Sequence, residues 1–161
     1  MENEGATSVE PDDLAWRWHD NLIYAIGFDI GDAQKQQWRS DLALDIDFIA
    51  EWLCEPSGAV RFRVAPATLT FHDVGDLAIS IDYGDSAGRT AITECSIDRV
   101  TRERLAGFRE NWRWSIRLNM PRGGKIDFSA SGFTETLRQP PRLLSEQRLP
   151  PGERHLHDKS P

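Results

Sequence analysis

Two carboxylates near the centre of the chain are spaced so that they could act together. Asp45 and Asp47 stand two residues apart in the stretch LALDIDFIAEW, residues 42–52. If this stretch is a strand, both side chains point to one face of the sheet, because successive side chains alternate between faces. Together with Glu51, they would form an acidic surface that attracts a basic protein partner through long-range electrostatics.

Two histidines each precede an aspartate and could supply a general base. The pairs are His19-Asp20 and His72-Asp73. Neighbouring residues on a strand point to opposite faces, so neither pair is by itself an acid–base couple. The two imidazoles could meet the central carboxylates across the sheet, and a histidine oriented by a carboxylate can accept a proton. Alternatively, each histidine only satisfies hydrogen bonds at the end of a strand.

The sequence lacks motifs for nucleophilic catalysis and for phosphate binding. There is no Gly-x-Ser-x-Gly, no phosphate-cradling glycine loop and no cysteine spacing typical of a metal site. The pattern Asp-x-Gly-Asp begins at Asp29, Asp73 and Asp82. We interpret it as a tight turn, in which Asp accepts backbone hydrogen bonds and Gly supplies a positive φ. Two carboxylates in a loop are too few to bind a cation, so we expect no metal and no cofactor.

The central stretch is predicted to be a core strand. Apolar residues alternate with others without a break from Leu42 to Phe48, which is the period of a half-buried strand. A helix is the alternative, because apolar residues from Leu42 to Leu53 also fit a helical face that Ser40 or Asp41 could cap. We favour the strand because its β-branched and aromatic residues prefer extended backbone.

Alternation of the same kind predicts further strands on both sides of this stretch. They cover residues 22–28, 60–64, 69–71, 77–83, 90–99, 112–120 and 126–130. Pro66 is expected to separate two of them, and residues 101–107 to form one helical turn. About eight short, evenly spaced strands predict a mainly β protein, an antiparallel β-sandwich or open barrel with little helix.

The 161 residues are enough for one domain with its own core. Residues 1–13 are acidic and lack apolar periodicity, so we expect a disordered arm. Residues 14–138 are predicted to form a single β domain. Residues 139–161 are expected to be a Pro-rich tail, partly disordered, whose leucines could dock on the body.

Charge and composition narrow the classes of partner. The net charge is −7, and acidic residues outnumber basic ones most clearly before residue 58. A nucleic-acid surface needs a basic footprint, so we expect no nucleic-acid partner. The sequence has neither a long apolar run nor the features of a signal peptide, and Cys54 and Cys95 are expected to be reduced and buried. We therefore expect a cytoplasmic protein with no membrane partner.

Arginines on the strand expected at 112–120 could neutralise the acidic residues of the central stretch. Arg113 and Arg117 could pair with Asp45 and Glu51 inside the fold, which would remove the acidic surface. The chain has six tryptophans, and the two on this strand are expected to fill the core. Any other tryptophan that is exposed near the carboxylates would mark a binding surface.

Three strings of residues carry a likeness to known proteins. They are Trp18-His19-Asp20 before the strand at 22–28, Leu44-Asp45-Ile46-Asp47-Phe48-Ile49, and Ala65-Pro66-Ala67-Thr68-Leu69-Thr70-Phe71. With these strings, residues 18–138 resemble a group of uncharacterised bacterial β-rich proteins. More distantly, they are similar to immunity proteins of bacterial polymorphic toxins, which share the His-Asp strand start. The resemblance implies a small β-rich cytosolic protein and brings no established activity or catalytic residues.

These observations predict a non-enzymatic, immunity-like protein that masks a basic protein partner with an acidic face. The expected binding residues are His19, Asp20, Asp45, Asp47, Glu51 and His72, with the loops Asp29–Asp32 and Asp82–Asp85. One alternative is an enzyme or small-ligand binder with a pocket of His19, Asp20, Asp45, Asp47 and His72. Another is a homodimeric structural subunit joined through an exposed strand edge. No catalytic residue is assigned.

Overall fold

The structure is a computed structural model that describes residues 11–84, 94–107 and 109–154. The last residue of the expected binding loop Asp82–Asp85 and the start of the strand expected at 90–99 lie outside these ranges. The side chains of residues 11–13 are also left undescribed. Within these ranges, no helix has the length and apolar character needed to cross a membrane.

A nine-stranded antiparallel sheet makes up most of the molecule and confirms the predicted mainly β fold. The strands are β1 (Leu22–Asp32), β2 (Gln37–Cys54), β3 (Val60–His72), β4 (Gly75–Ser80), β5 (Cys95–Arg104), β6 (Trp112–Met120), β7 (Lys125–Ala130), β8 (Gly132–Leu137) and β9 (Arg142–Leu144). Their order is β4-β7-β6-β5-β1-β2-β3-β8, with β9 also paired to β3. The terminal strands β4 and β8 are not paired with each other, so the described strands form an open sheet. Short helices α1 (Pro11–Arg17), η1 (Ala33–Lys35) and η2 (Pro151–Glu153) complete the fold.

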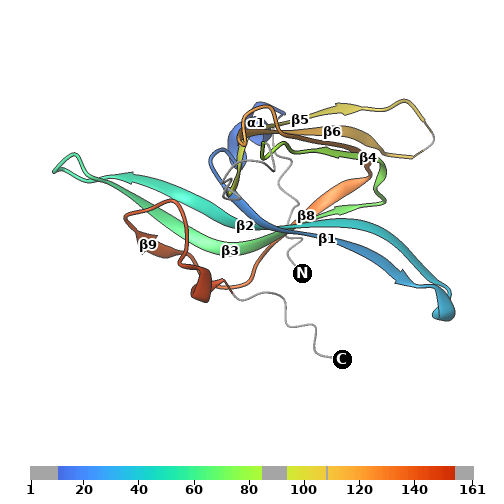
Figure 1. The fold of residues 1–161 in the computed structure, drawn as a ribbon, viewed down its shortest axis with the longest axis horizontal. Helices are drawn as coiled ribbons and strands as arrows, with labels where there is room; N and C mark the ends of the chain where they lie inside the picture. The colour runs from blue at the N-terminus through green and yellow to red at the C-terminus, as the bar shows by residue number, and fades with distance from the viewer. Residues whose placement is uncertain (1–10, 85–93, 108, 155–161) are drawn as a thin grey trace, which may run out of the picture.

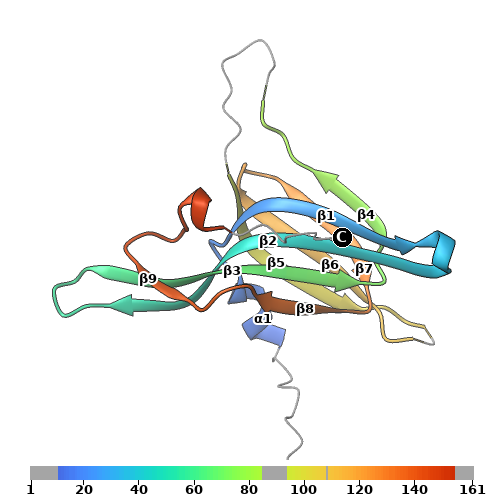
Figure 2. The ribbon, with the colours of Figure 1, turned by 90° about the horizontal axis from the view of Figure 1, so that it is seen from below.

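The sheet curls so that its two halves face each other around the core. Strands β4, β5 and β6 lie above β1, β2 and β3 in Figure 1, and Figure 2 shows the same halves from below. Phe71 of β3 joins the halves, because its ring centre lies 5.1 Å from that of Trp114 in β6 and 4.7 Å from that of Phe128 in β7. These edge-to-face contacts fill the space between the halves with aromatic rings.

Residues 42–49 lie within β2, so the predicted strand is confirmed and the helical alternative is wrong. The side chains of Leu42, Leu44 and Ile46 on the core face are fully buried. Asp45 and Asp47 lie on the opposite face, as the alternation predicts. β2 pairs with β1 on one side and with β3 on the other, which holds this stretch extended along its whole length.

Pro66 lies inside one continuous strand, β3, and does not separate two strands. β3 pairs with β8 from Ala67 onward and with β9 up to Val64. Pro66 therefore sits in the interval between these two partners, where its missing N–H removes no ladder hydrogen bond. On the other side of β3, it lies opposite Asp47 of β2.

Two segments at the ends of the expected domain are ordered by contacts distant in sequence. α1 begins at Pro11, inside the expected arm, and the buried Trp18 that follows it donates from Nε1 to Glu135 at 2.7 Å. β9 and η2 lie within the expected Pro-rich tail.

Residues 101–104 continue β5, because they pair with β6, so the expected helical turn is wrong.

Two hairpin arms extend from the body in opposite directions (Figures 1 and 2). One is made by β1 and β2 around η1, and the other by β2 and β3. Cys54, at the end of β2, is exposed on the second arm, whereas Cys95 is buried. The prediction that both cysteines are buried is therefore wrong for Cys54, because the arm reaches beyond the core.

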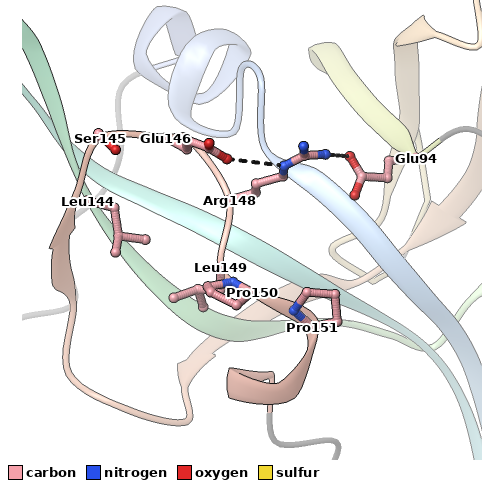
Figure 3. A pocket seen from close by; sticks show the side chains of 8 residues that line it. All are labelled: Glu94, Leu144, Ser145, Glu146, Arg148, Leu149, Pro150 and Pro151. Atoms are coloured by element: carbon pink, nitrogen blue, oxygen red, sulfur yellow. Dashed lines mark hydrogen bonds and ion pairs between the residues drawn. The ribbon is translucent and has the colours of Figure 1, made fainter.

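The C-terminal segment packs against the far end of β2 and β3. Leu149 is buried with Ile49, Phe62 and Val64 in a small second core, and Leu144 packs beside them. Figure 3 shows this segment, in which Arg148 pairs with Glu94 and Glu146. The second core keeps residues 142–154 on the sheet.

Candidate functional site

Asp47 is fully buried and held by the C-terminal segment. Arg154 Nη2 donates to Asp47 Oδ2 at 2.6 Å, and the backbone N–H of Leu149 donates to the same oxygen at 3.2 Å. Burial raises the pKa of Asp47 above its ordinary range, although both donors oppose the shift. With no exposed surface, this carboxylate is not available to a partner.

Tyr24 lies between two arginines beside this ion pair. The guanidinium carbon of Arg154 is 4.7 Å from the ring centre of Tyr24, and that of Arg138 is 5.7 Å away. Arg138 also donates a hydrogen bond to the Tyr24 hydroxyl, and its Nη1 lies 3.8 Å from Asp45 Oδ1. Burial lowers the pKa of Arg138. The cations nearest the two central aspartates thus come from the C-terminal part of the chain.

The expected ion pairs between the central acids and β6 are wrong. Arg113 pairs with Glu103 at 3.7 Å on the other half of the sheet. Glu51 pairs with Arg63 at 3.0 Å on the exposed β2–β3 arm. Because β6 belongs to the half that covers the core side of β2, its arginines cannot reach the opposite face, where Asp45 lies.

Asp45 lies in an open groove on the outer face of β1, β2 and β3. Thr68 Oγ1 donates to Asp45 Oδ1 at 2.6 Å across the β2–β3 pair. The groove has a volume of about 400 Å³ and is lined by Ala25, Ile26, Gly27, Phe28, Asp29, Asp41, Ala43, Asp45, Thr68 and Thr70. Because its middle is made of Ala25, Gly27 and Ala43, small side chains leave the space open between the carboxylates.

A carboxylate, an imidazole and a hydroxyl form a chain of contacts at one end of this groove. His72 Nδ1 lies 3.2 Å from Asp41 Oδ2, and His72 Nε2 lies 2.8 Å from Thr134 Oγ1. The three residues stand on β2, β3 and β8, respectively. With Nδ1–H donating to Asp41, Nε2 can accept the proton of the Thr134 hydroxyl.

His19 and Asp20 lie elsewhere, at the start of β1 beside β5. His19 Nδ1 lies 2.6 Å from the carbonyl oxygen of Asp98, and Asn119 donates to Asp20 at 3.0 Å. The backbone N–H of Asp20 donates to the carbonyl of Ile97 at 2.8 Å. These bonds satisfy the strand end, and neither residue meets the groove.

The six residues expected to bind therefore occupy separate places. Asp45 and His72 stand in or beside the groove, Asp47 is buried, Glu51 lies on an arm, and His19 with Asp20 lies at the β1–β5 junction. In residues 11–84, 94–107 and 109–154, no group of three His, Cys, Asp or Glu side chains could hold a metal ion.

Other cavities lie outside the groove. One, of about 560 Å³, is lined by the C-terminal segment and Glu94 (Figure 3). Another, of about 350 Å³, lies between the first residues of β1 and the pair Tyr83 and Cys95. The Tyr83 hydroxyl is 3.0 Å from Cys95 Sγ, and this contact, with burial, raises the pKa of Tyr83 to about 12.

Sequence reasoning missed several residues at the site. Asp41 follows the period of two in β2 that places Asp45 on the outer face, and Thr68 alternates with the buried Leu69 in β3, so alternation could have found both. Thr134 and Arg154 are far away in the sequence and carry no local signal. Comparisons of the chain with protein-family models, with curated proteins and with solved structures found no match.

Proposed function

We propose that this protein is a non-enzymatic binding protein whose outer groove takes a basic side chain of a protein partner. The observation that carries this proposal is the position of Asp41 and Asp45 in an open groove of about 400 Å³. A lysine or arginine stem could lie over Ala43 and Gly27 while its charged end reaches a carboxylate.

The groove favours a cation because its carboxylates are only partly exposed. The side chains of Asp41 and Asp45 are 13% and 17% exposed, respectively. Charges that are partly withdrawn from water interact more strongly than exposed charges and are less screened by salt. The net charge of −7 adds long-range attraction for a basic partner.

This proposed surface is narrower than the one expected from the sequence. Asp47 is excluded by its burial and its ion pair with Arg154. Glu51 lies on the other arm with Arg63. Asp45 remains because its side chain is 17% exposed, although Arg138 lies 3.8 Å from it, and Asp41 now joins it.

Titration of the full chain with short peptides tests the proposal. The probe is an arginine-containing hexapeptide, and its citrulline counterpart serves as the neutral control. We expect binding of the arginine peptide that weakens as salt rises and falls at least about tenfold when Asp41→Asn and Asp45→Asn are combined. Glu103→Gln, an exposed acid on β5, serves as the matched control and should bind as the wild type does.

Equal binding of both peptides, or equal binding by the double variant, would contradict the proposal. Far-UV circular dichroism and the melting temperature of each variant show whether a loss of binding reflects unfolding.

A second candidate function is proton transfer from Thr134, which the contacts of His72 favour. In this role Thr134 Oγ attacks an ester carbonyl, His72 Nε2 takes the hydroxyl proton and returns it to the leaving alcohol, and water then hydrolyses the acyl-threonine. Hydrolysis of p-nitrophenyl acetate by the full chain and by His72→Gln tests it. Equal rates would show that the Asp41–His72–Thr134 contacts are structural.

A further inference from the structure

β1 leaves the body with one edge uncovered. It pairs with β5 only at Leu22 and Ile23, while its other edge pairs with β2 along almost its whole length. From Tyr24 to Asp32, no strand in the described part of the chain pairs with the free edge of β1. This stretch contains neither lysine nor proline, two residues that commonly block pairing at an exposed edge.

Large apolar side chains stand along this uncovered edge. Phe28 is 61% exposed and Ile30 is 74% exposed, and Ile26 is partly buried against the core. The three alternate along β1, so they share one side of the sheet, the side of Leu42, which pairs with Phe28. The exposed rings and methyl groups of Phe28 and Ile30 offer apolar surface that a second chain would bury.

Along this edge, apolar residues occupy the same positions whether the stretch is read forwards or backwards from its central residue. The stretch is Ile26-Gly27-Phe28-Asp29-Ile30, with Phe28 at its centre. An antiparallel copy of the same stretch therefore places apolar side chains opposite apolar side chains. This symmetry is what an isologous two-fold interface requires.

We propose that two copies of this chain pair antiparallel through the free edges of β1, with the two-fold axis at Phe28. Phe28 then lies opposite Phe28 of the second copy, and Ile26 lies opposite Ile30 of the second copy. Asp29 lies opposite Gly27, so the carboxylates of the two copies do not face each other directly. The two sheets become one continuous sheet.

The local backbone limits where this pairing begins and ends. The pairing of β1 with β2 is irregular between Ile23 and Ala25 and again between Asp29 and Gly31. The N–H of Gly31 is already bonded to the Asp29 side chain at 2.9 Å. The regular stretch between these irregularities runs from Ala25 to Asp29 and contains Phe28, whereas Ile30 lies at its end, within the second irregularity.

The dimer would also complete the groove described above. Ala25, Gly27 and Asp29, which pair with outer-face residues of β2, form the β1 side of that groove. Pairing at this edge places Asp29 of the second copy opposite Gly27 and joins two grooves across the two-fold axis. The pairing itself does not depend on the proposed function, because the oligomeric state is measured without any partner.

Sedimentation velocity of the full chain tests the dimer. We expect a reversible monomer–dimer equilibrium that Phe28→Lys or Ile30→Lys shifts to monomer, because like or unpaired charges then lie in the apolar stripe. Trp52→Lys, which changes an exposed aromatic residue on the other arm, should leave the dimer unchanged. A wild-type chain that stays monomeric at millimolar concentration, or a dimer lost only in Trp52→Lys, would overturn the proposal. Circular dichroism confirms that each variant is folded.

Crosslinking tests the register in a Cys54→Ser background, which removes the exposed native thiol. Phe28→Cys should form a disulfide-linked dimer under mild oxidation, because directly opposed residues have Cα atoms about 4.5–5.5 Å apart. Ile30→Cys alone should not crosslink, whereas Ile30→Cys combined with Ile26→Cys should. Crosslinking of Ile30→Cys alone without crosslinking of Phe28→Cys would overturn the two-fold at Phe28.

Discussion

Asp47 and Arg154 form a buried ion pair that joins the centre of the sheet to the end of the described chain. The closest atoms are 2.6 Å apart, Asp47 is fully buried, and the Arg154 side chain is 11% exposed. The backbone N–H of Leu149 donates a further hydrogen bond to the Asp47 carboxylate. Asp47, one of the two aspartates prominent in the sequence, therefore fixes the C-terminal segment on β2 and is not available to a partner.

Arg154→Ala should strongly destabilise the fold. Removing one partner of a buried ion pair leaves the other charge buried without compensation, which costs about 3–5 kcal/mol. Arg148→Ala, in the same segment, breaks only exposed pairs with Glu94 and Glu146 and should change the stability little. Urea unfolding measures both variants. Equal, small effects would show that the buried pair does not hold the segment.

Asp47→Asn should change how stability depends on pH. The pKa of Asp47 is raised in the folded protein, so between its ordinary value, about pH 4, and the raised value the native state binds more protons than the unfolded state. The stability that Asp47 contributes is therefore complete below the ordinary pKa and is lost as pH rises through the folded pKa.

The free energy of unfolding of the wild type should accordingly fall relative to that of Asp47→Asn as pH rises through this window. Parallel urea titrations across the acidic range measure the difference. If the free energy of unfolding of the wild type instead rises relative to that of Asp47→Asn as pH rises, the pKa of Asp47 is lowered in the folded protein.

Phe71→Ala and Phe28→Ala make the same chemical change in two surroundings. Phe71 is fully buried against Trp114 and Phe128, so its truncation should cost about 3–5 kcal/mol. Phe28 is 61% exposed, so its truncation should leave the stability of the monomer almost unchanged. Thermal unfolding at low protein concentration measures both, and similar losses in the two variants would contradict the placement of the core.

Gly31→Ala should loosen the β1–β2 arm. Gly31 has φ +72°, and a Cβ there would overlap the carbonyl oxygen of Gln37. The substitution should therefore cost more than about 1 kcal/mol. Gly27→Ala on the same strand has no atom within 4 Å of the added Cβ and should be tolerated. Amide hydrogen exchange of the arm compares them, and equal exchange in both variants would argue against the tight turn.

The sequence alone determined the local pattern of this protein. Alternation placed Leu42, Leu44 and Ile46 on a buried face of β2 and put Asp45 and Asp47 on the other, because a strand turns successive side chains to opposite sides. The same periodicity identified most of β1, β6 and β7. These features depend only on neighbouring residues, and so they could be read without coordinates.

Only the tertiary structure decided the surroundings of those side chains. Asp45 and Asp47 share a strand and a face, yet one borders an open groove and the other is buried, because the C-terminal segment with Arg154 covers only one end of that face. Pro66 is tolerated in β3 because two separate partners flank it. Contacts between residues roughly a hundred positions apart leave no local pattern, since they depend on how the curled sheet brings distant segments together.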